Sequence, residues 1–526
     1  MNDIRLCLIE TIRPRGINFI APLNILYLAS YLTEKGILPR KNIQVIQTDF
    51  DLVVPAVAHQ KPHIIGFSAV TPNYNYAKKL ALQIRKVSDA QFILGGQHIS
   101  GLPMTLSYPF DIGVIGEGEQ TLAELIQSYQ GRKYQDDVLE KIKGIVYLRN
   151  KSPVVTPQRP LIDKEDIPKI DYSYITKERI FLYSTILDED KPISVKMSSI
   201  YSARGCPYHC RFCAHQIAWG NRSNFRLLNI KKVVDEIKFL HERYKVNCIS
   251  FRDDTFAISK ARIKELIQEL KKRNLLGKIY FDNVFGRANL IDDEFVILLK
   301  TLGVKSIFFG IDSGSKRILD YLKNGSLKTI DVKNAVRLCE KHKLWVIGSF
   351  MLFSPHETLN DINKTFRLAQ WFSKNKYAQR LNYCVTTPYP GTPMWIDAKN
   401  ENTLRVKGRP WRDFVMKKEN QFLRPFFKMS LSESQQEYVY NNFKSLALEI
   451  QHRKEEILNW KSLEALNHQK NNTMHNHFIA KIRMKYRLYM FLCFPFQSLK
   501  RIANKPWHIK YIINDVLTSI NYYRKL

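Results

Sequence analysis

Three cysteines lie within eight residues of this chain, in the segment Cys206-Pro-Tyr-His-Cys210-Arg-Phe-Cys213. The whole chain has only 8 cysteines in 526 residues, so chance is a poor explanation for this spacing. Three thiolates on one short loop can hold an iron–sulfur cluster and leave one iron without a protein ligand. Because an open position distinguishes a reactive metal centre from a structural one, the pattern indicates an enzyme whose cofactor or substrate completes the site.

A structural zinc site is the alternative, with His209 or His215 as the fourth ligand. Such a site is closed by four protein ligands at once. It gives no reason for the long series of strands and helices that the sequence predicts after the cysteines. We therefore favour the iron–sulfur cluster.

Length and charge limit the remaining possibilities. At 526 residues the chain exceeds the size of a single core, so we expect two or three domains. The formal net charge of +32 favours an anionic partner. No segment has the roughly 18 to 20 apolar residues that span a bilayer, and the first ten residues do not resemble a signal peptide. The other cysteines are scattered singly, so we expect a cytoplasmic protein.

The first 130 residues alternate short apolar strands with amphipathic helices, which is typical of a doubly wound parallel sheet. Two glycine turns, Leu94-Gly-Gly-Gln-His98 and Ile115-Gly-Glu-Gly-Glu119, each follow a predicted strand directly. Open α/β sheets bind ligands at the carboxyl ends of their strands, so these turns predict a cofactor crevice. The predicted strands are 4–9, 43–48, 64–68, 92–94 and 112–115, and the predicted helices are 23–35, 75–88 and 119–130.

A second series of strands and helices follows a proline-rich stretch. Its six parallel strands can curve into a partial barrel, in which chemistry takes place on the loops at the strand C-termini. The cysteines lie on the first of these loops. The fold class is thus α/β, with a Rossmann-like domain at 1–150, a linker at 151–195, a partial (β/α)6 barrel at 196–420 and a basic helical region at 421–526. The predicted barrel strands are 198–202, 247–251, 279–285, 306–311, 345–353 and 382–387.

The Cys-x3-Cys-x2-Cys spacing, with Phe212 before the last cysteine, resembles the radical S-adenosylmethionine superfamily. The resemblance implies that Cys206, Cys210 and Cys213 hold a [4Fe–4S] cluster whose fourth iron binds S-adenosylmethionine. It also implies that one electron from an external reductant, such as flavodoxin or ferredoxin, cleaves this cofactor to a 5′-deoxyadenosyl radical.

Later motifs resemble the same superfamily in order along the barrel. Phe309-Gly-Ile-Asp-Ser-Gly314 is similar to its fourth-strand motif, with Asp312 in place of the usual glutamate. The segments 348–358 and 388–393 are similar to the ends of its fifth and sixth strands, although His356 replaces a glycine. Either Asp253 or Asp254 would accept from the cofactor amine, and a surface position is the alternative for Arg287. The S-adenosylmethionine contacts that the resemblance implies are Phe212, Asp253, Arg287, Asp312 and Ser313.

The segments 64–71, 93–98 and 113–119 resemble the cobalamin-binding module that precedes some radical barrels. After the first strand the chain reads Glu10-Thr-Ile-Arg-Pro-Arg-Gly16, which lacks the histidine that coordinates cobalt in other modules. The resemblance therefore implies either a corrinoid held without a histidine ligand or a domain that binds none, and we expect His98 to be a packing or surface residue. The Gly-x-Gly-x-x-Gly motif of NAD domains is absent after the first strand. The cobalamin contacts that the resemblance implies are Ser68, Thr71, Gly95, Gly96, Gly116 and Glu117.

The leading functional hypothesis is a cobalamin-dependent radical enzyme that methylates an unactivated carbon of a small-molecule or lipid-like metabolite. A radical cyclase or rearrangement enzyme of the same family, with no methyl transfer, is the alternative. A tRNA-modifying methylthiotransferase is a remote one, because it needs three more cysteines in the first domain, which has only Cys7. A non-catalytic corrinoid or iron–sulfur sensor does not explain the barrel motifs.

The last segment, Lys481–Leu526, has ten Lys or Arg residues against one acid, Asp515, and interleaves them with aromatic residues. This pattern fits a peripheral contact with an anionic membrane surface, a nucleic-acid contact or a solvated helical cap. Of the possible partners, nucleic acid is the least favoured.

Overall fold

The computed structural model describes residues 4–11, 21–46, 50–131, 133–215, 217, 225–405 and 425–458. The chain divides into two compact units, Met1–Ile457 and Leu458–Leu526, and the fold described below belongs to the first. The basic segment Lys481–Leu526 lies outside the described residues. No helix in the described ranges has the length and apolar character that crossing a bilayer requires.

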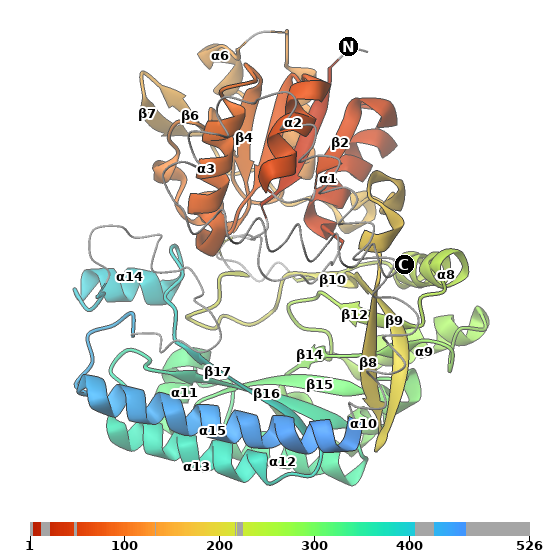
Figure 1. Ribbon diagram of the computed structural model, residues 1–526, viewed down its shortest axis with the longest axis vertical. Helices are drawn as coiled ribbons and strands as arrows, with labels where there is room; N and C mark the ends of the chain where they lie inside the picture. The colour runs from red at the N-terminus through yellow and green to blue at the C-terminus, as the bar shows by residue number, and fades with distance from the viewer. Residues whose placement is uncertain are drawn as a thin grey trace, which may run out of the picture. The chain divides into compact units, whose positions relative to one another are not determined.

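A seven-stranded sheet in the order β2-β1-β3-β4-β5-β6-β7 forms the N-terminal domain. Strands β1 to β5 are parallel, whereas β6 and β7 are antiparallel additions at one edge. The predicted doubly wound sheet is therefore confirmed (Figure 1). The strands are β1 (Leu6–Glu10), β2 (Ile43–Ile46), β3 (Ile64–Ser68), β4 (Gln91–Gly95), β5 (Ile112–Val114), β6 (Ile145–Arg149) and β7 (Ser152–Val155).

Helices cover both faces of this sheet, because successive strand residues point to opposite sides. Leu8 and Ile93 pack with α1 (Leu23–Glu34) and α5 (Glu119–Gln127) on one face. Ile9 and Phe92 pack with α2 (Phe50–Gln60) and α3 (Tyr74–Ile84) on the other. Helix α2 was not predicted, and it contains Pro55. Two shorter helices, α4 (Gln97–Gly101) and α6 (Asp136–Leu139), follow β4 and precede β6.

The segment predicted as a linker, 151–195, contains strands of both domains. Strand β7 lies at the edge of the N-terminal sheet, where a proline such as Pro153 is tolerated because no further strand needs its N–H. Strand β8 (Leu182–Asp188) pairs antiparallel with β9 (Lys191–Ile200), which is the first barrel strand. That strand thus begins earlier than predicted.

Two four-stranded sheets, β13-β12-β9-β8 and β14-β15-β16-β17, make up the partial barrel. The single strand predicted at 279–285 is two short strands, because Asn283 adopts a left-handed conformation (φ 55°) between them. One of these strands pairs in each sheet, so the chain passes from the first sheet to the second at Asn283. The other strands are β12 (Cys248–Phe251), β13 (Tyr280–Phe281), β14 (Val284–Gly286), β15 (Ser306–Asp312), β16 (Trp345–Leu352) and β17 (Ala378–Val385).

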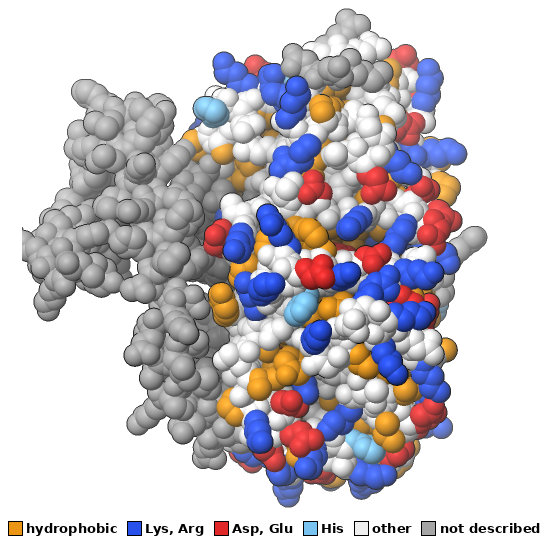
Figure 2. Space-filling model, turned by 90° about the vertical axis from the view of Figure 1, so that its right-hand side faces the viewer, with side chains coloured by type: hydrophobic (Ala, Val, Ile, Leu, Met, Phe, Trp, Pro, Cys, Tyr) orange, Lys and Arg blue, Asp and Glu red, His pale blue; other side chains and the backbone are white. Residues whose placement is uncertain are grey.

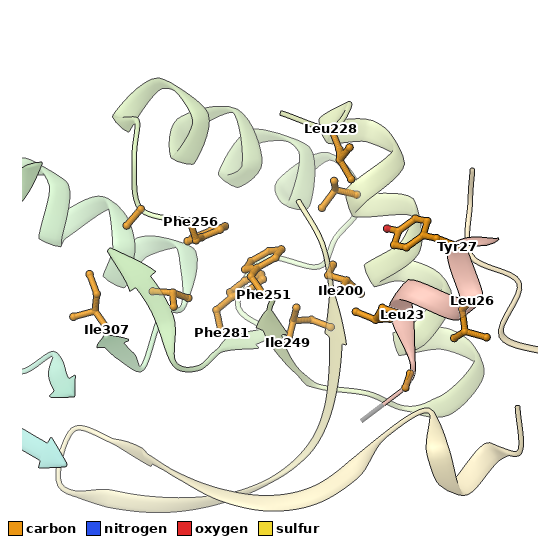
Figure 3. Close-up of a cluster of buried hydrophobic side chains, with 14 of the residues drawn as sticks. Leu23, Leu26, Tyr27, Ile200, Leu228, Ile249, Phe251, Phe256, Phe281 and Ile307 are labelled. Carbon is orange, nitrogen blue, oxygen red and sulfur yellow. The ribbon is translucent and has the colours of Figure 1, made fainter. Parts of the chain in front are cut away.

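Aromatic side chains fill the barrel core beside the first strands. The rings of Phe251 and Phe256 stack with centroids 4.2 Å apart, and Phe281 stacks on Phe251 at 5.4 Å (Figure 3). Ile200 and Ile249 extend the same cluster. The surrounding helices are α8 (Ile230–Tyr244), α9 (Lys260–Lys272), α10 (Asp293–Leu302), α11 (Lys316–Lys323), α12 (Thr329–Lys341), α13 (Leu359–Ser373), α14 (Pro393–Asn400) and α15 (Glu433–Leu458).

Candidate functional site

The cysteine loop begins where the first barrel strand has ended. Gly205 precedes it with φ 79°, a conformation that glycine adopts without strain. Cys206, Cys210 and Cys213 are half-buried thiols that form no disulfide within the described part of the chain. The end of α11 anchors the loop, since the Arg211 N–H donates to the Leu322 carbonyl (3.0 Å) and the Asn324 side chain donates to the His209 carbonyl (2.6 Å). The three thiols are thus presented on a loop that is fixed from outside.

The electrostatics of this loop suit a cationic group. Burial, with a smaller contribution from charge on Asp254 and Cys210, raises the pKa of Cys206 to about 11 and that of Cys213 to about 12. The apoprotein alone therefore disfavours three thiolates there, whereas iron stabilises them. Among the described residues, no three His, Cys, Asp or Glu side chains converge on one metal ion. A cubane cluster does not require such convergence, because each thiolate binds a different iron.

Arg287 lies at the end of β14 against the cysteine loop. Its guanidinium packs over the Tyr208 ring at 3.7 Å, and Nη1 lies 3.8 Å from the Cys210 sulfur. Nη2 donates to the Ser326 carbonyl and hydroxyl at 3.1 and 2.7 Å. Arg287 is 8% exposed, so the surface alternative is wrong and the cation lies beside the cluster loop.

The two aspartates after β12 have different surroundings. Asp253 is buried and accepts hydrogen bonds from the Ser202 and Ala203 N–H groups at 2.7 and 3.1 Å, and also from the Ser202 hydroxyl. Burial raises its pKa to about 7 despite these bonds. Asp254 instead lines the cavity described below. Asp253 therefore shapes the turn before the cysteines, and of the two it is Asp254 that faces an open space.

Asp312, at the end of β15, forms an ion pair with Lys323 of α11, and the Nζ to Oδ2 distance is 2.7 Å. Both side chains are buried, and Lys323 Nζ also lies 5.6 Å from the Phe212 ring centroid. Ser313 is fully buried and contacts the Thr365 hydroxyl at 3.0 Å. Phe212 and Asp312 are thus brought together, whereas the hydroxyl of Ser313 is engaged within the protein. Lys323 was not predicted, because a lysine on an amphipathic helix is usually solvated.

A cavity of about 430 Å³ lies at the carboxyl ends of the N-terminal strands. It is also lined by Tyr201, Arg204, Gly205, Arg252 and Asp254 of the barrel, so it extends to the residue directly before Cys206. No histidine is among the described residues that line it. Of the segment 10–16, which lacks the cobalt-binding histidine, Glu10 lines the cavity and residues 12–16 lie outside the described ranges. Of the predicted cobalamin contacts, the cavity is lined by Ser68, Gly95, Gly96, Gly116 and Glu117.

Glycines give this cavity a floor of bare backbone. Gly96 has φ 99°, and a Cβ there would lie 2.5 Å from the Ala69 carbonyl oxygen. Gly116 has φ 81°. Gly96 is therefore required where this turn packs on Ala69, and Gly95, Gly96 and Gly116 line the cavity without side chains, as the close approach of a ligand to the backbone requires.

Two predicted residues do not lie free in the cavity. Thr71 is buried, and its hydroxyl lies 3.2 Å from Nδ1 of His98. His98 stacks on Tyr74 with centroids 3.8 Å apart, and burial lowers its pKa to about 4, as befits a packing residue. Glu117 is paired with two arginines, Arg204 and Arg226, at 2.7 and 2.8 Å. The Glu117 carboxylate is therefore engaged in ion pairs within the protein.

Comparison with known proteins agrees with this geometry. A model of the radical SAM superfamily matches residues 200–369, and a model of the B12 binding domain matches residues 18–126. An uncharacterized methyltransferase of Pyrococcus horikoshii is 29% identical over 75% of this chain and 81% of its own length. The anaerobic magnesium-protoporphyrin IX monomethyl ester cyclase of Cereibacter sphaeroides is 26% identical over 67% of this chain, which spans 57% of that protein.

Solved structures share the fold over most of the chain. The radical S-adenosylmethionine methyltransferase TsrM of Kitasatospora setae, with cobalamin and a [4Fe-4S] cluster bound, superposes with a TM-score of 0.64 at 19% identity, covering 84% of this chain and 91% of its own. The cobalamin-dependent radical enzyme OxsB superposes with a TM-score of 0.63 at 15% identity, covering 84% and 66%.

The two family models lie in the expected order and together span more than half of the chain. The cysteine loop falls within the match to the radical SAM model, and the glycine turns fall within the match to the B12-binding model. The two matches imply that the cofactors of this chain are a [4Fe–4S] cluster, S-adenosylmethionine and cobalamin. The chain belongs to the radical S-adenosylmethionine enzymes that carry an N-terminal cobalamin-binding domain.

Proposed function

We propose that this enzyme methylates an unactivated carbon of a small-molecule or lipid-like substrate, with cobalamin as the methyl carrier. The observation that carries the proposal is the shared wall of the two sites. The cavity at the glycine turns includes Arg204 and Gly205, and Cys206 follows directly. A radical generated at the cluster and a methyl group carried by the corrinoid would meet near this wall, where the protein's part is to position the cofactors.

The chain's residues divide this work. Cys206, Cys210 and Cys213 would hold the cluster, which supplies the electron that cleaves S-adenosylmethionine. Arg287, beside Cys210, is suited to the carboxylate of that cofactor, and Asp254 is suited to its amine. We assign the cobalamin domain to the chain up to β7 and the radical barrel to β8 through β17.

Partners and location follow from the chemistry. We propose that a low-potential carrier such as flavodoxin or ferredoxin supplies the electrons and that the enzyme works in the cytoplasm. On the face in Figure 2, Lys and Arg side chains are spread among Asp and Glu rather than gathered into one patch. This face therefore offers no basic patch for nucleic acid. Contact of the basic C-terminal segment with a membrane surface stays a prediction.

Radical cyclisation is the second candidate, and it is favoured by the similarity to the cyclase of Cereibacter sphaeroides. Both chemistries use the same domain order. Radical formation leaves 5′-deoxyadenosine in both chemistries. Only methyl transfer also leaves S-adenosylhomocysteine, because a second S-adenosylmethionine supplies the methyl group that cobalamin carries.

The experiment uses the full chain, reconstituted anaerobically with iron and sulfide, with or without hydroxocobalamin. S-adenosylmethionine and a chemical reductant are added, and both nucleoside products are measured. We expect S-adenosylhomocysteine that depends on hydroxocobalamin, together with 5′-deoxyadenosine that does not. If 5′-deoxyadenosine forms but S-adenosylhomocysteine does not respond to bound cobalamin, cyclisation or rearrangement replaces methyl transfer.

A further inference from the structure

Four charged side chains join the cobalamin domain to the strand pair that leads into the cysteine loop. Arg204 donates through Nη1 to Glu117 and through Nη2 to Glu119, both at 2.7 Å. Arg226 donates to Glu117 at 2.8 and 3.0 Å. We call Arg204, Arg226, Glu117 and Glu119 the ionic joint.

Local structure brings these residues together. Strands β10 (Ala203–Arg204) and β11 (Arg226–Leu227) pair antiparallel, with Arg204 directly opposite Arg226. Glu117 lies in the glycine turn after β5, and Glu119 is the first residue of α5. Both acids therefore lie where this turn leads into α5, beside the cavity, and one of the arginines lies two residues before Cys206.

The joint is buried and balanced in charge. Side-chain exposure is 7% for Arg204 and Glu117, 5% for Glu119 and 15% for Arg226. Burial by itself lowers the pKa of Arg204, but Glu119 and Glu117 raise it above its ordinary value, so the guanidinium stays charged. Tyr27, another residue that lines the cavity, packs 4.8 Å from that guanidinium.

Buried ion pairs are weak sources of stability, because taking the charges out of water offsets their attraction. Their best attested role is to fix one geometry among several. Buried ion pairs between two domains can therefore fix the distance between groups that lie on either side of the interface. Here the interface separates the cysteine loop from the corrinoid cavity.

We propose that Arg204, Glu117 and Glu119 are positioning residues that hold the cluster loop at one separation from the corrinoid. This rests on the proposed use of both cofactors in one reaction. The inference changes the role of Glu117, which the sequence predicts as a cobalamin contact. Its carboxylate acts on the barrel, and the backbone of its glycine turn faces the cavity.

The test compares Arg204→Met and Glu119→Gln with the matched control Arg85→Met. Arg85 also forms an ion pair, with Asp111 at 2.6 Å, which is partly buried and lies wholly within the N-terminal domain. The first measurement is the distance between the reduced cluster and cob(II)alamin, by pulsed electron paramagnetic resonance on the reconstituted full chain. The second is backbone hydrogen exchange of residues 203–213 in the cluster-loaded protein, which needs no corrinoid.

We expect one narrow distance distribution in the parent and in Arg85→Met, and a broadened or shifted one in both joint variants. Exchange in residues 203–213 should be faster in the joint variants by a factor on the order of ten, and unchanged in the control. An unchanged distance distribution or unchanged exchange in Arg204→Met would overturn the proposal. If the unmutated protein binds no cobalamin, the proposed methyl transfer through cobalamin is wrong. The hydrogen-exchange result still decides whether the ionic joint holds the cysteine loop.

Glu117→Gln separates the two roles of that residue. A direct corrinoid ligand would give weaker hydroxocobalamin binding with unchanged exchange in residues 203–213. A positioning residue gives faster exchange there, in the absence of cobalamin as well. The first outcome would contradict the proposal for Glu117.

Discussion

The buried pair of Asp312 and Lys323 gives a prediction that can be worked from distances. Lys323 Nζ and Asp312 Oδ2 are 2.7 Å apart, and the two side chains are 9% and 5% exposed. At an effective dielectric constant of about 20, Coulomb attraction at this distance is about 6 kcal/mol. Desolvation of both groups opposes most of it, so the pair adds little net stability while each charge depends strongly on the other.

Lys323→Met should therefore lower the free energy of unfolding by about 3 to 5 kcal/mol, because it leaves the Asp312 carboxylate buried and unpaired. Asp312→Asn should be destabilising for the same reason. Asparagine suits this site, since Asp312 has φ 61° and asparagine tolerates left-handed backbone. The double variant removes both charges, so we expect it to be more stable than the sum of the single effects predicts by about 2 kcal/mol or more.

The assay is urea unfolding of the full chain under anaerobic conditions, followed by circular dichroism in all four members of the cycle. Lys316→Met is the control on the same helix, because Lys316 pairs with Asp320 while its side chain is 84% exposed. We expect this control to change stability by less than about 0.5 kcal/mol. Additive single effects within about 0.5 kcal/mol would refute the reasoning, since they would mean that the two charges do not interact.

Three further predictions test the cluster, the cavity floor and a buried acid. Alanine at Cys206, Cys210 or Cys213 should each abolish cleavage of S-adenosylmethionine in the reduced, reconstituted protein, and product from any one variant contradicts the cluster assignment. Gly96→Ala should weaken hydroxocobalamin binding by at least about tenfold, because its Cβ would clash with Ala69. Gly36→Ala, also at positive φ but with nothing within 4 Å, should leave binding unchanged, and equal effects would count against the cavity. Burial raises the pKa of Glu357 from 4.5 to about 8. Between these two pH values the folded state keeps a proton on Glu357, whereas the unfolded chain has released it. Stability should therefore fall as pH rises from about 4.5 to 8, by up to about 1.4 kcal/mol per pH unit. Glu357→Gln should make this slope shallower in urea unfolding and leave only what other buried acids such as Asp253 contribute. Parallel pH profiles for the two proteins would show that Glu357 makes no contribution.

The fold was largely predictable because buried parallel strands are continuous apolar runs in the sequence. Strand β3 was predicted with its observed limits, Ile64–Ser68. The break at Asn283 was not, since left-handed backbone at a single asparagine leaves no mark in the apolar pattern. The antiparallel edge strands were also missed, because Pro153 argues against a strand unless the sheet edge is known to be there.

Some features of the candidate site could be predicted from the sequence and others could not. The cysteines and glycine turns were predictable, since local spacing defines both. The charge pairs were not, because a contact such as Arg204 with Glu117 joins residues 87 positions apart. Only the paired β10 and β11 strands and the docked domain bring the ionic joint together. A charged residue seen in sequence alone is ordinarily expected to be solvated.

The central claim is that one chain holds a radical-generating cluster and a corrinoid side by side. Anaerobic reconstitution with iron, sulfide and hydroxocobalamin, followed by desalting and visible absorption, tests it most directly. We predict an iron–sulfur shoulder together with corrinoid bands at about one cobalamin per chain. A cluster spectrum with no retained corrinoid would contradict the claim, although the radical barrel would stand.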